Sequence, residues 1–150
     1  MSKAATKNPA LKPLEVLIGK WKTVGKHPML PGVVLKGKAS FKWHKKGAFL
    51  LMQTHIDHKD FPDGIAIFGT DDSEKEMSMI YFDERKVSRT YTSTLKKNVW
   101  KWWRKDKKFS QRFTGKIKDN GKTIELKGEM SKNGKRWEKD LELIYTRTSK

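Results

Sequence analysis

The sequence contains no cysteine, which excludes disulfide bonds, cysteine-ligated zinc sites and cysteine nucleophiles. Long apolar runs are also missing: no stretch approaches the length of a membrane span, and residues 1–7 lack the apolar segment of a secretory signal peptide. A length of 150 residues suits one hydrophobic core. We therefore expect a soluble, cytoplasmic protein with a disordered basic tail at residues 1–7 and a single domain at residues 8–150.

Acidic residues are scarce: 17 Asp and Glu stand against 34 Lys and Arg, a net charge of +17. High charge with only 35% hydrophobic residues is typical of disorder, but six Trp, seven Phe and three Tyr indicate a folded chain. Only six of the basic residues are Arg, the side chain suited to precise phosphate recognition. We interpret the many Lys as a solvated exterior with no single obvious patch.

One short helix is predicted near the start. Asn8 is a suitable N-cap, and Pro9 suits the first helical position, where a missing N–H costs nothing. Leu11, Leu14 and Leu17 follow at spacings of three, so the helix presents one apolar stripe to another element.

From Leu17 onward the apolar residues alternate with polar ones, as in β-strands with one buried face. Nine turn signals interrupt the alternation at regular intervals, which predicts about ten strands in up-and-down order. Asn120-Gly121 and Asn133-Gly134 are the clearest signals, because a type I′ turn needs positive φ at both central residues. In the last strand the phase places Leu141, Leu143 and Tyr145 on the dry face and Asp140 on the wet one.

Closure of such a sheet removes its two exposed edges, so we predict an all-β fold: a closed antiparallel up-and-down barrel of about ten strands with a short N-terminal helix. A barrel of this size has room inside for a small ligand or for large side chains. Seven aromatic residues are the expected wall: Trp21, Phe41, Trp43, Trp100, Trp102, Phe113 and Tyr145. They either line a cavity or fill it as a core.

Gly19-Lys20-Trp21 after the helix resembles the Gly-x-Trp of lipocalin-like (calycin) barrels. Further motifs resemble a family of bacterial lipocalin-like proteins that carries no assigned activity: Phe49-Leu50-Leu51, Ile67-Phe68-Gly69-Thr70-Asp71, Tyr81-Phe82-Asp83, Arg89-Thr90-Tyr91, Trp100-Lys101-Trp102-Trp103-Arg104, residues 109–115 and Ser131-Lys132-Asn133-Gly134. The resemblance covers about residues 11–147 and implies the same barrel. Haem-binding nitrobindins are more distantly similar, but their proximal His lies near the end of the barrel. The last His here is His58, so we expect no haem and no other cofactor.

Arg89 and Tyr91 are predicted to share the dry face of one strand. An inward Arg is costly unless an anion meets it, so the pair indicates a site for an acidic headgroup. Fatty-acid-binding barrels use a similar Arg-x-Tyr on a different strand. The alternative is that Arg89 pairs with Asp83 or Asp57, or faces water.

Trp100, Trp102 and Trp103 alternate with basic residues, a pattern that single-strand nucleic-acid binders use for stacking. Trp100 and Trp102 share a face, which favours the interior instead. His55 and His58 are three apart on a strand and point to opposite faces, so we predict no metal site. His55, with Gln53 and Gln111 as inward polar groups, is the candidate for acid–base chemistry.

Three functions follow in order. The first is non-catalytic binding of a small, largely apolar ligand, with or without an acidic headgroup, at Arg89, Tyr91, Trp43, Trp100, Trp102, Gln53, His55, Gln111 and Phe113. The second is nucleic-acid or polyanion binding through the basic exterior. The third is an enzyme of unknown reaction.

Overall fold

The computed structural model describes residues 7–71 and 76–150. Most of the expected tail, residues 1–6, lies outside the described residues, as do Asp72 and Ser73 of one turn signal. Ten strands follow a short helix, η1 (Pro9–Leu17). They are β1 (Gly19–Lys26), β2 (Leu35–His44), β3 (Phe49–Ile56), β4 (Gly64–Thr70), β5 (Met77–Asp83), β6 (Val87–Lys96), β7 (Val99–Arg104), β8 (Ser110–Lys118), β9 (Thr123–Ser131) and β10 (Glu138–Ser149).

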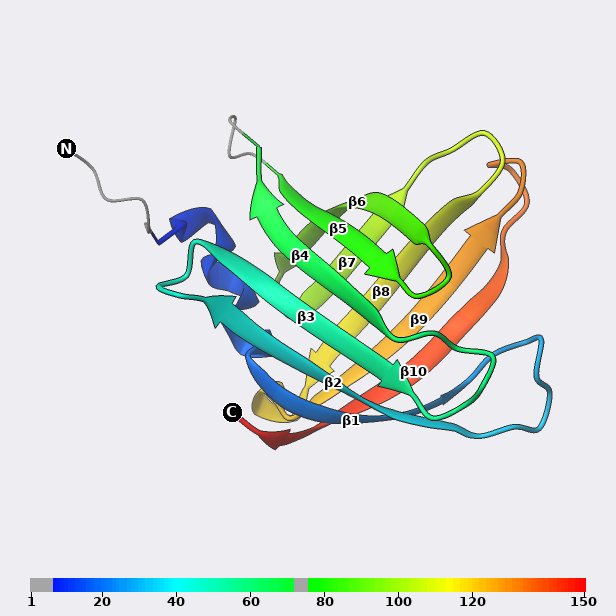
Figure 1. Cartoon of the computed structure of the whole chain (residues 1–150), viewed down its shortest axis with the longest axis horizontal. Coiled ribbons are helices and arrows are strands. Elements are labelled where there is room, and N and C mark those ends of the chain that lie inside the picture. Colours follow the sequence, from blue (N-terminus) through cyan, green and yellow to red (C-terminus); the bar gives the residue numbers. More distant parts are fainter. Residues whose placement is uncertain (1–6, 72–75) are drawn as a thin grey trace.

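The strands form one closed barrel in which each pairs antiparallel with its neighbours along the chain (Figure 1). β1 also pairs with β10, from Lys26 opposite Glu142 to Lys20 opposite Ser149, and this pairing closes the sheet. The predicted all-β, up-and-down barrel with a short N-terminal helix is therefore confirmed.

The helix closes one end of the barrel. It is a 3-10 helix, in which side chains three apart are eclipsed, so the spacing of Leu11, Leu14 and Leu17 places all three on one face. All three are fully buried. As predicted, Asn8 is the N-cap, and its side chain accepts a hydrogen bond from the Ala10 N–H at 3.0 Å. Within the described residues, the helical segments are too short and too polar to traverse a lipid bilayer.

Arg147 of β10 holds this closed end together. Its guanidinium donates to the carbonyls of Val16 and Ile18 and, at 3.1 Å, to that of Gly121. The Cζ atom of this guanidinium also lies 4.2 Å from the centre of the Trp21 ring, in a cation–π contact. One side chain thus joins the end of η1, β10 and the turn between β8 and β9.

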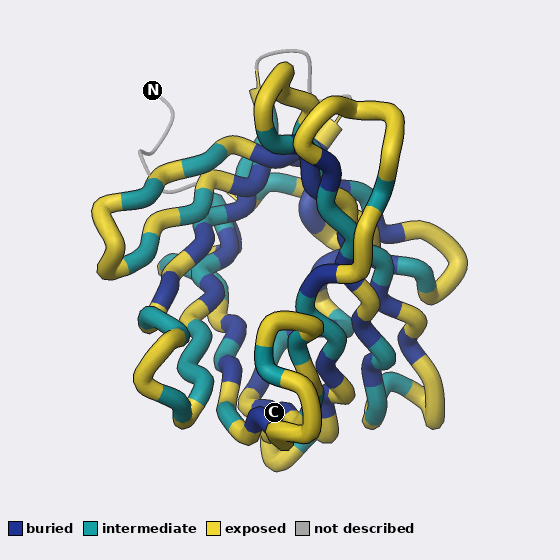
Figure 2. Tube along the Cα trace, turned by 90° about the vertical axis from the view of Figure 1, so that its right-hand side faces the viewer, coloured by how far each residue is buried: buried dark blue, intermediate teal, exposed yellow. Residues whose placement is uncertain are grey.

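The barrel is filled at the closed end and hollow at the other. Beneath η1 the interior is a core of fully buried side chains, among them Trp21, Phe41, Phe68 and Trp100. Figure 2 looks into the opposite end, where buried positions surround the interior. The expected aromatic wall therefore divides: Trp102, Phe113 and Tyr145 line the hollow half, while Trp21, Phe41 and Trp100 belong to the core.

One of the two turn predictions is confirmed. Asn120 and Gly121 both have positive φ, 54° and 84°, and the Lys122 N–H donates to the Asp119 carbonyl, as a type I′ turn requires. The other is wrong, because Asn133 does not have positive φ. Its side-chain oxygen instead accepts from the N–H groups of Lys135 and Arg136, at 2.8 and 2.9 Å, and organises a longer loop.

Gly25 provides a test of how closely β1 and β10 approach. A Cβ at this position would lie 1.8 Å from the Glu142 carbonyl oxygen, which is backbone and cannot rotate away. We expect Gly25→Ala to lower the free energy of unfolding by about 2 kcal/mol. Gly69→Ala is the matched control, since nothing lies within 4 Å of its Cβ position. Urea unfolding of both variants measures the difference, and equal stability would contradict such a close approach.

Candidate functional site

The hollow half of the barrel contains a cavity of about 630 Å³. It opens at the end opposite η1, where the loops that follow β1, β3, β5, β7 and β9 lie (Figure 1). Apolar side chains form most of its wall, among them Met52, Ala66, Trp102, Phe113 and Leu143. Trp102 and Phe113 stack with ring centres 4.8 Å apart. The cavity is therefore large enough and apolar enough for a small organic ligand.

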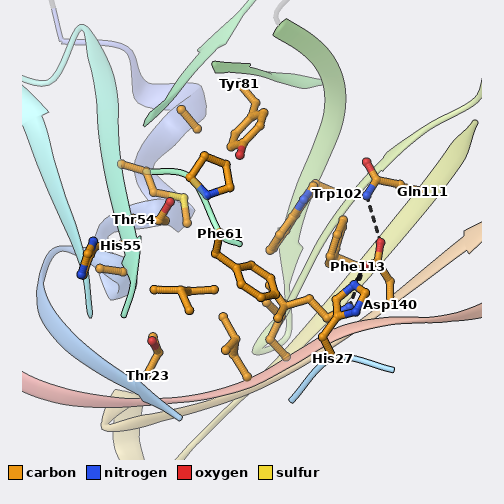
Figure 3. A pocket seen from close by; sticks show the side chains of 18 of the residues that line it. Thr23, His27, Thr54, His55, Phe61, Tyr81, Trp102, Gln111, Phe113 and Asp140 are labelled. Atoms are coloured by element: carbon orange, nitrogen blue, oxygen red, sulfur yellow. Dashed lines mark hydrogen bonds and ion pairs between the residues drawn. The ribbon is translucent and has the colours of Figure 1, made fainter. Parts of the chain in front are cut away.

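A chain of hydrogen bonds crosses one side of the cavity (Figure 3). The Tyr91 hydroxyl donates to Gln111 Oε1 at 2.5 Å, and Gln111 Nε2 donates to Asp140 Oδ2 at 3.0 Å. The other oxygen, Asp140 Oδ1, lies 3.1 Å from His27 Nε2 and accepts from the Leu141 N–H at 2.8 Å. The side chains of Gln111 and His27 thus meet at the buried Asp140 carboxylate, and Tyr91 joins them through Gln111.

The hydrogen bonds assign the tautomer of His27. Its Nδ1 accepts from the Met29 N–H at 3.1 Å, so Nδ1 carries no proton. The proton is therefore on Nε2, which donates to Asp140. Both ring nitrogens are engaged, so His27 is a neutral structural partner and has no free lone pair for a ligand or a metal.

Asp140 also determines which groups donate and which accept in the other hydrogen bonds of this network. Its carboxylate can only accept, so the Gln111 side chain must turn its NH₂ toward Asp140 and its oxygen toward Tyr91. The single Tyr91 proton is then committed to Gln111. Burial raises the pKa of Tyr91, although the nearby Arg89 and Arg104 charges act in the opposite direction. Tyr91 therefore stays protonated at neutral pH and offers the cavity only oxygen lone pairs.

The alternation of residues in the last strand placed Asp140 on the outer face, which is wrong. The register between β9 and β10 shifts between Lys139 and Glu142, and this β-bulge turns both Asp140 and Leu141 toward the cavity. Asp140 is only 7% exposed as a result. One signal was present in the sequence: Lys139 occupies a position that the alternation would have made apolar. The sequence analysis did not single out His27, because this residue begins a His-Pro turn signal.

Arg89 is half-buried at the cavity wall, as its predicted inward direction requires. Its guanidinium lies 4.8 Å from the centre of the Phe109 ring. Within the described residues, no carboxylate forms an ion pair with it. Asp83 was one of the two alternative partners expected for Arg89. It instead forms an ion pair with Arg85 at 2.7 Å and accepts a hydrogen bond from the Tyr81 hydroxyl at 2.7 Å.

The remaining predicted site residues fall into two groups. Gln111, Trp102, Phe113 and His55 line the cavity together with Arg89 and Tyr91. Trp100 is fully buried in the core beneath it, and Trp43 lies beside η1 at the closed end. Gln53 is exposed on the outer face of β3, because the inward positions of this strand are Leu50, Met52 and Thr54; its expected inward direction is wrong.

His55 and His58 have separate partners. His55 Nδ1 lies 2.6 Å from Asp63, and His58 Nδ1 lies 3.8 Å from Asp60, both at the exposed rim. Within residues 7–71 and 76–150, no group of three or more His, Asp or Glu side chains is close enough together to hold a metal ion.

Comparisons with known proteins show the fold. No protein-family model matches the chain, and no curated protein matches it. Among solved structures, the crystal structure of Rv2717c from M. tuberculosis is similar, with a TM-score of 0.64 and 16% sequence identity over 95% of this chain and 99% of that one. At this identity the likeness supports the barrel and not membership of the lipocalin-like family.

Asp140→Asn tests the hydrogen-bonded chain. The new NH₂ group would face a donor from either His27 or Gln111, leaving a buried N–H without an acceptor. We expect the free energy of unfolding to fall by about 1–3 kcal/mol. Asp63→Asn at the exposed rim is the control and should change stability by less than about 0.5 kcal/mol. Urea unfolding at neutral pH measures both, and a stable Asp140→Asn protein would show that the carboxylate is not needed.

Asp83 gives a prediction about pH. Burial acts to raise the pKa of its carboxyl, but hydrogen bonds from Arg85 and Tyr81 outweigh burial and lower the pKa from 3.8 to about 2. The resulting stabilisation is present above the unfolded value and is lost as the pH falls through the folded one. Compared with Asp83→Asn, the protein should be more stable by on the order of 1–2 kcal/mol above pH 5.

This advantage should disappear between about pH 4 and pH 2, the interval between the two pKa values. Urea unfolding of both proteins from pH 2 to 7 measures it. A difference that stays constant down to pH 2 would contradict the role given to the carboxylate.

Proposed function

We propose that the protein binds a small, largely apolar molecule with an acidic headgroup inside the barrel, without converting it. The observation that carries the proposal is a half-buried Arg89 without an ion-pair partner among the described residues, at the wall of an apolar cavity of about 630 Å³. Known ligand pockets of this kind measure about 300–1,000 Å³ and combine apolar walls with a few polar groups.

Arg89 is the group that would hold the headgroup. Arg85 also lines the cavity, but its guanidinium is already paired with Asp83. Arg104 donates to the Phe109 carbonyl at 3.1 Å and is not among the residues that line the cavity. Of the two arginines that line the cavity, Arg89 is therefore the one without an acidic partner among the described residues, and a carboxylate or sulfonate can accept two hydrogen bonds from its guanidinium.

Tyr91 contributes differently from the hydroxyl donor that its spacing from Arg89 indicates. Its proton is committed to Gln111, so only its oxygen faces the ligand. A ligand hydroxyl or amide N–H could donate to that oxygen while an adjacent acidic group binds Arg89. Ligands with a donor next to the acid group are therefore expected to bind more tightly than simple acids.

The proposal includes no haem. His27 lines the cavity, but both its ring nitrogens are engaged, and His55 bonds Asp63 at the exposed rim. Membership of the lipocalin-like family, a cytoplasmic location and a single domain stay predictions.

The matched probes 1-anilinonaphthalene-8-sulfonate and N-phenyl-1-naphthylamine test the proposal, because they share an aromatic skeleton and differ by the sulfonate. Arg89→Met should weaken binding of the sulfonate probe by about ten- to a hundred-fold, the usual range for a lost charged hydrogen bond. The neutral probe should be unaffected. Fluorescence titration gives both affinities.

Arg112→Met is the control variant, since Arg112 lies on the outer face of β8 and pairs with Glu129. It should bind both probes like the unmodified protein. Equal loss of the two probes in Arg89→Met, or no binding of either probe to the unmodified protein, would refute the proposal. Native mass spectrometry of the purified protein, followed by extraction, would identify a copurified ligand.

A further inference from the structure

The hairpin formed by β1, β2 and the loop between them combines two kinds of exposed surface. We call it the β1–β2 hairpin: its stem is Gly19–Lys26 with Leu35–His44, and its tip is residues 27–34. The stem has a basic outer face, and the tip is apolar.

Pairing of β1 with β2 gathers lysines that are separated in the sequence. Lys20, Lys22, Lys36, Lys38 and Lys42 are all exposed on the same outer face, and Lys22 lies directly opposite Lys38. Like charges opposite each other destabilise a sheet, so this arrangement has a cost that the fold itself does not require. The expectation that the lysines form no single patch is wrong for this face.

The charges of this face lack partners. Within the described residues, none of the five lysines forms an ion pair. The acidic residues nearest in register are at its margin: Glu142 opposite Lys26, and Asp57, whose N–H donates to the Lys36 carbonyl. On β8 and β9, Lys118 pairs with Glu125 and Arg112 with Glu129, both at 2.8 Å, while Lys116 and Lys127 form no ion pair among the described residues.

The tip exposes apolar side chains beside these lysines. Met29 is 81% exposed, Val34 64% and Val33 36%. No Asp, Glu, Lys or Arg occurs between Lys26 and Lys36. Two successive turns shape the loop, with Leu30 N–H donating to the His27 carbonyl at 3.0 Å and Val33 N–H to the Leu30 carbonyl at 3.2 Å. Figure 1 shows the loop extending beyond the open end of the barrel.

We propose that the β1–β2 hairpin docks the protein on an anionic lipid bilayer. The tip would insert Met29 and Val34 among the lipid headgroups, while the lysines of the stem meet the lipid phosphates and carboxylates. The basic surface matches the anionic headgroups of such a membrane, and the adjacent apolar tip matches the apolar region beneath them.

A nucleic acid fits this surface less well. Lysines would meet its phosphates, but stacking on bases requires exposed aromatic rings. The aromatic residues of the stem are Trp21 and Phe41, both fully buried, and Trp43, which packs against the core. The exposed apolar residues of the tip are aliphatic and give bases no stacking surface.

The tip lies at the opening of the cavity, so docking would affect how a ligand enters. Met29 and Leu30 belong to the tip and also line the cavity, so a docked hairpin would bring the cavity opening to the membrane surface. An apolar ligand could then pass between the lipid and the barrel with little exposure to water. This last step depends on the proposed ligand binding, whereas docking itself does not.

Vesicle sedimentation tests the basic face. The unmodified protein should bind vesicles of phosphatidylcholine with 30% phosphatidylglycerol and should not bind phosphatidylcholine alone. Changing Lys20, Lys22, Lys38 and Lys42 to Gln should weaken binding by about a hundred-fold or more, since each lysine near an anionic surface contributes about five-fold. The control changes Lys96, Lys101, Lys116 and Lys127 of β6 to β9 to Gln, with the same loss of charge and a much smaller effect.

Insertion of the tip needs a separate readout. Because the chain has no cysteine, Met29→Cys can carry a single bimane label, whose emission should shift to the blue on anionic vesicles. A label at Lys135→Cys, an exposed position in the β9–β10 loop at the same end, should not shift. Met29→Ser with Val34→Ser should weaken vesicle binding and leave the fold intact, because both side chains are exposed.

Three outcomes would overturn the proposal: equal losses in the two lysine variants, no shift at position 29, or an oligonucleotide that binds through the four lysines while vesicles do not bind. Arg89→Met separates this proposal from ligand binding, because it should bind vesicles normally while losing the sulfonate probe.

Discussion

Burial of Leu11, Leu14 and Leu17 in one end of the barrel is the constraint on which the other features depend. A closed sheet of ten strands encloses more space than its own inward side chains fill, and η1 fills one end of it. Core packing therefore concentrates beneath the helix, around Trp21 and Trp100. The other end stays hollow, so the cavity, its polar groups and its opening all lie on the side away from η1.

Within the hollow half, the buried Asp140 carboxylate has the role that a metal ion has in other sites: it fixes the orientation of the groups around it. Each neighbour must present a donor, which sets the tautomer of His27, the rotation of Gln111 and the direction of the Tyr91 hydroxyl. Asp83 acts in the same way at the rim by engaging Arg85. The polarity of the cavity thus follows from two carboxylates that need not touch a ligand themselves.

The sequence predicted the architecture well because the alternation of buried and exposed residues and the turn residues all indicate the same barrel. It predicted Arg89, Tyr91, Trp102, Gln111 and Phe113 at the cavity for the same reason. It failed at two residues for different reasons: the bulge at Asp140 breaks the alternation and reverses that side chain, whereas Gln53 was assigned to the inner face although the regular alternation of β3 places it outside. How far the aromatic residues fill the barrel depends on how deeply η1 packs into it. The alternation within the strands does not encode that depth.

Closure of the barrel by β1 and β10 also affects how the chain can fold. β1 is made first among the strands but gains its second partner only when β10 has been synthesised, and Arg147 reaches back to Ile18, which is 129 residues earlier. Contacts of such long sequence separation form slowly. During synthesis the edge of β1 therefore remains open to pairing with other chains, and the exposed lysines of its outer face repel a second copy during that interval.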